Sequence, residues 1–207
     1  MIEALLFNKT IFILFFISYL IGGIPFGYII FKYKKKADIR NFGSGNIGAT
    51  NINRLLGKKS GFVTLLLDFS KTYFPTLLAH KYFGTEIGVI CGVLLIIGHM
   101  FPIWLKFKGG KGVAGFIAFL AVTSWPLCII YFLIWIISVK IFKYSAVGAI
   151  IATILNICLF KIALFLQFKY ELFLWLRGDP LEFYYTLFIR LLIVLKHKKN
   201  IISLLKL

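Results

Sequence analysis

The sequence has few acidic residues, few cysteines and little charge of any kind. Only 7 of its 207 residues are Asp or Glu, and Asp, Glu, Lys and Arg together make up 15%. So few carboxylates, none of them clustered, argue against an oxygen-ligated metal centre. The three cysteines, Cys91, Cys128 and Cys158, lie far apart in apolar runs, which excludes a disulfide framework and a zinc-ligand spacing.

Apolar residues dominate what is present. They make up 60% of the chain, and the mean hydropathy is +0.93, which predicts an all-α integral membrane protein. The net charge of +17 would suggest nucleic acid as the partner of a soluble protein. In a membrane protein the lipid bilayer is the better explanation, because basic residues gather on the cytoplasmic side and face anionic lipid. We therefore expect no nucleic-acid partner.

The apolar runs predict several membrane-spanning helices in a single membrane-embedded domain, residues 1–207. The runs cover residues 11–31, 61–79, 87–105, 113–139, 144–166 and 181–195. The fourth contains Ser124-Trp125-Pro126, so it is either one tilted span or two short helices joined at the proline. Seven spans, with the N-terminus outside and the C-terminus inside, put most basic residues in the cytoplasm. Charge therefore favours seven transmembrane helices with cytoplasmic motif loops.

The first motif is "NFGSGNIGATNINR", residues 41–54, with a GxGxxG spacing at Gly43, Gly45 and Gly48. A dinucleotide site would need an apolar strand before it, but the basic segment KYKKKADIR stands there. A P-loop would need a Lys-Ser/Thr pair, which is missing. Glycines still allow backbone N–H groups to converge on an anion, and the side chains that could join them are Ser44, Asn46, Thr50, Asn51 and Arg54. We expect a phosphate-binding loop; the alternative is an interfacial connector whose arginine contacts lipid headgroups.

The second motif is "GHMFPIWLKFKGGKGVAG", residues 98–115, on the same predicted membrane face. It places Lys106, Lys108 and Lys111 around Gly109, Gly110 and Gly112. We expect Lys106 to be a lipid anchor, and Lys108 and Lys111 to contact phosphate. His99 lies near the start of the motif; a single histidine at the end of a span is more often structural than catalytic.

Two further segments carry polar groups. At the C-terminus, "KHKKNIISLLKL" places His197 and Asn200 on one helix face, where both could donate to an oxyanion; taken alone, the segment is a basic tail on anionic lipid. Asp68 and Lys71 lie three apart within a predicted span. A structural ion pair is the first interpretation of these two residues, and a catalytic carboxylate is the second.

Taken together, these segments resemble the bacterial acyl-phosphate:glycerol-3-phosphate acyltransferase family. The resemblance includes "YLIGGIPFGYII" and "LLLDFSK" and spans most of the chain in order. It implies a seven-span enzyme of the inner membrane that transfers a fatty acyl group from acyl phosphate to the 1-hydroxyl of glycerol 3-phosphate. The product would be lysophosphatidic acid, the first intermediate of phospholipid synthesis. The resemblance implies no cofactor and a functional link to an enzyme that produces acyl phosphate.

The resemblance also implies the site residues. The catalytic positions would be Ser44, Arg54, His99, Lys111 and His197. The substrate-binding positions would be Gly43, Gly45, Asn46, Gly48, Thr50, Asn51, Lys108, Gly109, Gly110, Gly112 and Asn200, with no metal. The chain departs from the family at Ser145-Ala146 and Gly148-Ala149, where the family has paired small hydroxyl residues, and in its SLLKL ending.

The chemistry sets the task for these residues. Acyl phosphate already has a good leaving group, so the enzyme must align a hydroxyl while holding two phosphates that repel each other. We expect Arg54 to bind the acceptor phosphate and Lys108 and Lys111 to neutralise the donor phosphate. A substrate phosphate, with a second pKa of about 6, is the expected proton acceptor, and His99 or His197 is the alternative. The rival function is a transporter or channel for a phosphorylated small anion.

Overall fold

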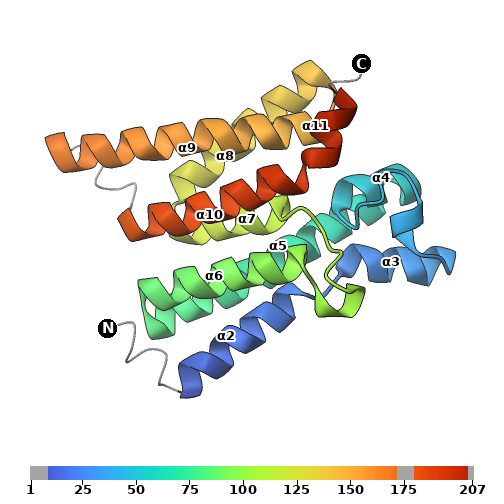
Figure 1. Cartoon of the computed structure of the whole chain (residues 1–207), viewed down its shortest axis with the longest axis horizontal. Coiled ribbons are helices and arrows are strands. Elements are labelled where there is room, and N and C mark those ends of the chain that lie inside the picture. Colours follow the sequence, from blue (N-terminus) through green and yellow to red (C-terminus); the bar gives the residue numbers. More distant parts are fainter. Residues whose placement is uncertain (1–8, 172–179, 205–207) are drawn as a thin grey trace. The chain divides into compact units, whose positions relative to one another are not determined.

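The computed structural model describes residues 9–171 and 180–204, and all regular structure within these ranges is helical (Figure 1). The helices are α2 (Lys9–Gly22), α3 (Phe26–Lys35), η1 (Ile39–Asn41), α4 (Ala49–Leu56), α5 (Lys58–Phe83), α6 (Thr85–Met100), η2 (Ile103–Leu105), α7 (Val113–Thr123), α8 (Trp125–Phe142), α9 (Ser145–Tyr170), α10 (Pro180–Lys196) and α11 (Lys198–Leu204). They fall into two compact units, Met1–Gly115 and Phe116–Leu207.

The distribution of polar and apolar side chains is that of a membrane protein. Large apolar side chains such as Phe12, Phe62 and Ile162 are exposed, whereas Asp68 and Arg190 are buried. Four segments are long and apolar enough to cross a membrane: Lys9–Lys35, Thr85–Leu105, Trp125–Phe142 and Ser145–Tyr170. The prediction of an all-α membrane protein is confirmed for the described residues.

The fourth apolar run forms two helices. Helix α7 ends at Thr123, and α8 begins at Trp125 after the cap residue Ser124. Pro126 lies in the first turn of α8, where a helix needs no backbone N–H from it. The second interpretation of this run, two helices joined at the proline, is therefore correct.

In the first unit, α6 packs against both α2 and α5 (Figure 1). The backbones of α2 and α6 come very close, because a Cβ on Gly22 would collide with the backbone of Leu95 and one on Gly98 with the carbonyl of Tyr19. Small residues allow such close approach between membrane helices. Cys91 is fully buried in the apolar cluster between these helices, which agrees with a packing role.

In the second unit, α9 packs against α8 and α10. Gly148, in the segment that departs from the family pattern, allows the close approach of α8: a Cβ there would lie 3.0 Å from the carbonyl oxygen of Trp135. Deeper in the unit, the hydroxyls of Tyr131 and Thr153 are hydrogen bonded at 3.1 Å. A side-chain hydroxyl pair and a glycine contact thus join α8 to α9.

Candidate active site

Glycines shape the first motif loop, which connects η1 to α4. The backbone φ angle is 59° at Gly43 and 68° at Gly45, a region that favours glycine. A Cβ on Gly43 would also collide with the side-chain oxygen of Asn51. The loop ends at Gly48, the N-cap residue of α4, and no side-chain hydrogen bond caps this helix terminus.

Asn51 organises this loop from the inside. Its amide oxygen accepts a hydrogen bond from the Ser44 backbone N–H at 3.0 Å. Its amide nitrogen donates to the carbonyls of Phe42 at 3.1 Å and Asn46 at 2.9 Å. An amide side chain offers two N–H groups and one oxygen, so both N–H groups and the oxygen of this one engage the loop backbone. With Asn51 only 2% exposed, its geometry fits a role in loop shape.

The other side chains predicted to bind phosphate from this loop face outward. Ser44, Thr50 and Arg54 are exposed, and Asn46 is half-buried. The loop therefore combines a fixed backbone with polar groups at its surface, as an anion-binding loop requires.

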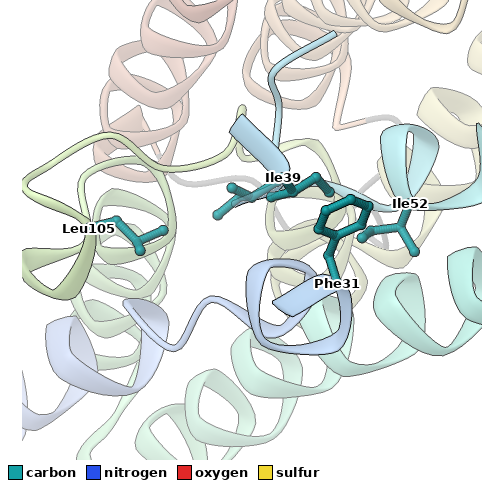
Figure 2. Close-up of a cluster of buried hydrophobic side chains, with 5 residues drawn as sticks. Phe31, Ile39, Ile52 and Leu105 are labelled. Carbon is teal, nitrogen blue, oxygen red and sulfur yellow. The ribbon is translucent and has the colours of Figure 1, made fainter. Parts of the chain in front are cut away.

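The two motif loops are joined through a shared apolar cluster, shown in Figure 2. Four of its residues come from α3, η1, the first loop and α4, and the fifth comes from η2 in the second loop. The cluster consists of Phe31, Ile39, Ile47, Ile52 and Leu105. The carbonyl of Ile47 lies so close to α3 that a Cβ on Gly27 would collide with it. Burial of these side chains holds the loops together.

A salt bridge adds a polar connection between the loops. Arg40 and Asp38 form a salt bridge at 2.6 Å, and Arg40 Nη1 donates to the carbonyl of Leu105 at 3.2 Å. The hydrogen bonds from Arg40 lower the pKa of the Asp38 carboxyl. Sequence reasoning missed this connection. The local Asp-x-Arg spacing could have suggested the salt bridge, but no sequence signal pointed to Leu105.

The second loop folds back onto the end of α6. The backbone N–H groups of Gly109 and Gly110 donate to the carbonyls of Met100 at 3.2 Å and His99 at 3.0 Å. A Cβ on Gly110 would collide with Nε2 of the His99 ring. The double glycine therefore allows the loop to lie directly against the imidazole.

The lysines of the second loop differ in burial. Lys106 and Lys108 are exposed, whereas Lys111 is half-buried. Burial lowers the pKa of Lys111 to about 8, because removal from water disfavours the charged form. Arg54, in the last turn of α4, and Lys108, in the second loop, are thus both exposed in a unit whose two motif loops are in contact.

A buried ion pair lies beneath the second loop. Lys71 Nζ lies 2.9 Å from Asp68 Oδ1, so the expected structural ion pair is confirmed. The same ammonium donates to the carbonyl of Ile24 at 2.6 Å, between α2 and α3, and lies 3.0 Å from His99 Nδ1. The ammonium thus has three polar neighbours: a carboxylate, a backbone carbonyl and an imidazole nitrogen. Sequence reasoning did not connect His99 with this pair.

The contact with Lys71 defines the protonation of His99. An ammonium can only donate, so a charged Lys71 makes Nδ1 of His99 the acceptor and places the proton of the neutral ring on Nε2. The acceptor Asp68 Oδ1 lies farther from the same Nδ1, at 3.6 Å. This Nε2 is the atom that Gly110 faces. With His99 only 5% exposed, the ring presents an N–H group toward the second loop.

The histidine of the C-terminal motif, His197, carries its proton on the other ring nitrogen. His197 lies between α10 and α11 and is 2% exposed. Its Nδ1 is 2.7 Å from the carbonyl of Ile193. A carbonyl can only accept, so Nδ1 carries the proton and Nε2 of the neutral ring has the lone pair. The backbone N–H of Asn200 donates to the carbonyl of His197 at 2.8 Å. Both residues belong to the second unit.

Comparison with known proteins identifies the family. The glycerol-3-phosphate acyltransferase family profile matches residues 12–207. A glycerol-3-phosphate acyltransferase of Bartonella henselae is 38% identical over 204 residues, covering 95% of this chain and 89% of the relative. One of Leptospira borgpetersenii is 38% identical over 193 residues, covering 92% of this chain and 86% of the relative.

Solved structures agree with the sequence relatives. The fold is similar to the crystal structure of PlsY (YgiH), an integral membrane glycerol 3-phosphate acyltransferase, in its glycerol 3-phosphate form. The TM-score is 0.84 with 35% identity over 96% of this chain and 93% of that one. The lysophosphatidic acid form gives a TM-score of 0.79 and 34% identity, with the same coverage. The chain therefore belongs to the glycerol-3-phosphate acyltransferase family.

Proposed function

We propose that this glycerol-3-phosphate acyltransferase takes its acyl group from acyl phosphate and transfers it to the 1-hydroxyl of glycerol 3-phosphate. Lysophosphatidic acid and inorganic phosphate are the products. The observation that carries the proposal is the joining of the two motif loops by the Arg40–Leu105 hydrogen bond and the shared apolar cluster. Two glycine loops held together in this way, each with exposed cations, suit a reaction between two phosphorylated substrates.

In this proposal the two loops divide the phosphates between them. Arg54, with Ser44, Asn46 and Thr50, binds the acceptor phosphate, because a planar guanidinium matches phosphate geometry. Lys108, Lys111 and backbone N–H groups of the second loop neutralise the donor phosphate and the oxyanion that forms at the carbonyl carbon. Asn51 supports this arrangement by fixing the first loop.

The glycines have a related role. Gly43, Gly45 and Gly48 bring the first-loop backbone close to one phosphate, and Gly109, Gly110 and Gly112 do so for the other. His197 and Asn200, the polar residues of the C-terminal motif, contribute hydrogen bonds to the reaction in this proposal. The segment around Ser145 then affects activity less than the two loops do.

The proton of the attacking hydroxyl goes to a substrate phosphate in this mechanism. The hydroxyl oxygen forms a bond to the acyl carbon, the bond from that carbon to the phosphate oxygen breaks, and the released phosphate leaves with both electrons. His99 is poorly suited as the base, because its Nδ1 faces the Lys71 ammonium at 3.0 Å. His197, whose Nδ1 already carries the proton, is the alternative base, since its Nε2 has the lone pair.

We further propose seven membrane spans with the N-terminus outside, the C-terminus inside and the motif loops in the cytoplasm. The separation of α7 from α8 at Ser124 supports this count, and the distribution of lysines supports the orientation. The enzyme would then lie in the inner membrane as a single domain over residues 1–207. Acyl phosphate would reach it from the enzyme that produces this donor.

The donor is tested by supplying the purified enzyme with acyl phosphate, acyl carrier protein thioester and acyl-CoA in turn. We expect lysophosphatidic acid from acyl phosphate alone. Formation from either thioester at a similar rate would contradict the proposal. The rival transporter is tested in liposomes, where uptake of labelled glycerol 3-phosphate without acyl transfer would favour it. Cysteine labelling at Ser44 and Lys108 should place both loops on the cytoplasmic face.

A further inference from the structure

Arg190 is a buried cation in the second unit that the proposed chemistry does not use. It lies in α10 and is 0% exposed. Its Nη1 donates to the hydroxyl of Thr186 at 2.6 Å, one turn earlier in the same helix. Its Nη2 donates to the side-chain oxygen of Asn156, in α9, at 2.7 Å. A charge within a membrane protein is costly to bury, and such residues often have a function.

The guanidinium also connects three other helices. It lies over the ring of Phe116 in α7 at 5.2 Å and over that of Phe160 in α9 at 5.4 Å. Asn156, which accepts from Arg190, donates to the carbonyl of Leu127 in α8 at 3.1 Å. One side chain of α10 is thereby fixed against α7 and α9, and through Asn156 against α8.

The buried polar residues of α10 continue to the C-terminal motif. Glu182, Thr186, Arg190 and His197 are all at most 5% exposed. Their spacings of four and seven residues place them on one face of the helix. The Nδ1 bond of His197 to Ile193 ties the imidazole to its own helix. The rotation of α10 about its axis therefore determines where this ring points.

We propose that Arg190 is a positioning residue for acyl transfer, which fixes the rotation of α10 and thereby the direction of the His197 ring. This inference rests on the proposed role of His197. A guanidinium suits the task because its N–H groups lie in one plane and here reach two different partners. An apolar side chain of similar length would keep the helices packed but would not select one rotation. Lysine would keep the charge without the planar fork.

The decisive variant replaces both partners: Arg190→Met together with Asn156→Leu. Removing both sides of the Arg190–Asn156 contact leaves neither of these two partners unpaired, so the fold should lose less stability than with Arg190→Met alone. We expect the kcat of this double variant to fall at least tenfold with a KM for glycerol 3-phosphate within twofold of wild type. Arg190→Lys should lower kcat as well. Tyr131→Phe is the matched control, because it removes a buried hydroxyl of the same unit whose hydrogen bonds are to Ala149 and Thr153 in α9, and its kcat should stay within twofold.

A second readout does not depend on activity. In detergent, the imidazole ¹⁵N signals of His197 should shift in the double variant, while those of His99, in the other unit, should stay as in the wild type. In a His197→Gln background, Arg190→Met should lower kcat no further, because both changes act through one group. An unchanged kcat, or an unchanged His197 spectrum, in the double variant overturns the proposal. Failure of the proposed function would instead appear in the wild-type enzyme, as no lysophosphatidic acid from acyl phosphate.

Discussion

Among the described residues, each of the two units buries one cation, and the hydrogen-bond partners of the two cations differ. In the first, Lys71 contacts the carboxylate of Asp68 at 2.9 Å. In the second, Arg190 has neutral hydrogen-bond partners, Thr186 and Asn156, and two aromatic rings. Each unit also holds a histidine that the sequence predicts to be catalytic: Lys71 contacts His99, and Arg190 lies seven residues before His197.

The difference shows how a helix bundle can control a histidine in two ways. Lys71 acts directly, since its ammonium makes Nδ1 of His99 an acceptor and leaves the proton on Nε2. The backbone acts on His197, where a carbonyl makes Nδ1 a donor. The same residue type thus presents an N–H group in one unit and a lone pair in the other.

The largest expected effect comes from removing each cation. Lys71→Met leaves the Asp68 carboxylate buried without a positive charge, so we expect the free energy of unfolding to fall by about 3–5 kcal/mol. Arg190→Met removes a hydrogen-bond donor from Thr186 and Asn156, and we expect a loss of about 1–3 kcal/mol. Unfolding in detergent measures both. Adding Asp68→Asn to Lys71→Met should recover much of the loss, and equal losses for the two single variants would contradict the comparison.

Gly110→Ala tests the contact between the second loop and His99. A Cβ there collides with the imidazole, so the loop must move away and take Lys111 with it. We expect kcat to fall by about 100-fold, since displacement of about 1 Å at an active site can have this effect. Gly84→Ala is the control, because its Cβ meets nothing within 4 Å although its φ of 91° disfavours alanine. That variant should lose some stability and keep its kcat.

His197→Ala tests the proton acceptor. We expect kcat to fall by roughly 10- to 100-fold, as for the loss of a hydrogen bond to a charged group. A base must be deprotonated to act, so the wild-type kcat should fall as the pH drops through about 6, the second pKa of a phosphate. Measured from pH 5 to 8, this fall should persist in His197→Ala. Its disappearance would identify His197 as the base and exclude the substrate-assisted mechanism.

Sequence patterns predicted the local features of this protein and missed those that depend on tertiary contacts. The apolar runs located the long helices but not the break between α2 and α3 or the short helices α4 and α11. The spacing of Asp68 and Lys71 predicted their ion pair. The contact of Lys71 with His99 could not be predicted, because it joins helices α5 and α6 through side chains distant in sequence. Asn51 is a similar case: its type suggests a phosphate ligand, and only the folded loop shows that its amide engages the backbone. The segment Ser124-Trp125-Pro126 left two interpretations open, one tilted span or two helices. A proline can lie in a kinked span or in the first turn of a second helix, so the sequence alone did not decide between them.

The smallest effect is expected for Lys111→Arg, which keeps a positive charge at this position but raises the pH at which that charge is lost. Burial lowers the pKa of Lys111 to about 8, so the free enzyme loses this positive charge as the pH rises through that value. If the charge binds a substrate phosphate, kcat/KM should fall above about pH 8, since this ratio reports the free enzyme. Lys111→Arg keeps the charge at any such pH, so the fall should move to higher pH while kcat/KM at pH 7 changes only a few-fold. Lys106→Arg, in the exposed part of the same loop, is the control and should leave the profile unchanged. A wild-type profile that is flat between pH 7 and 9 would show that the charge of Lys111 does not bind phosphate.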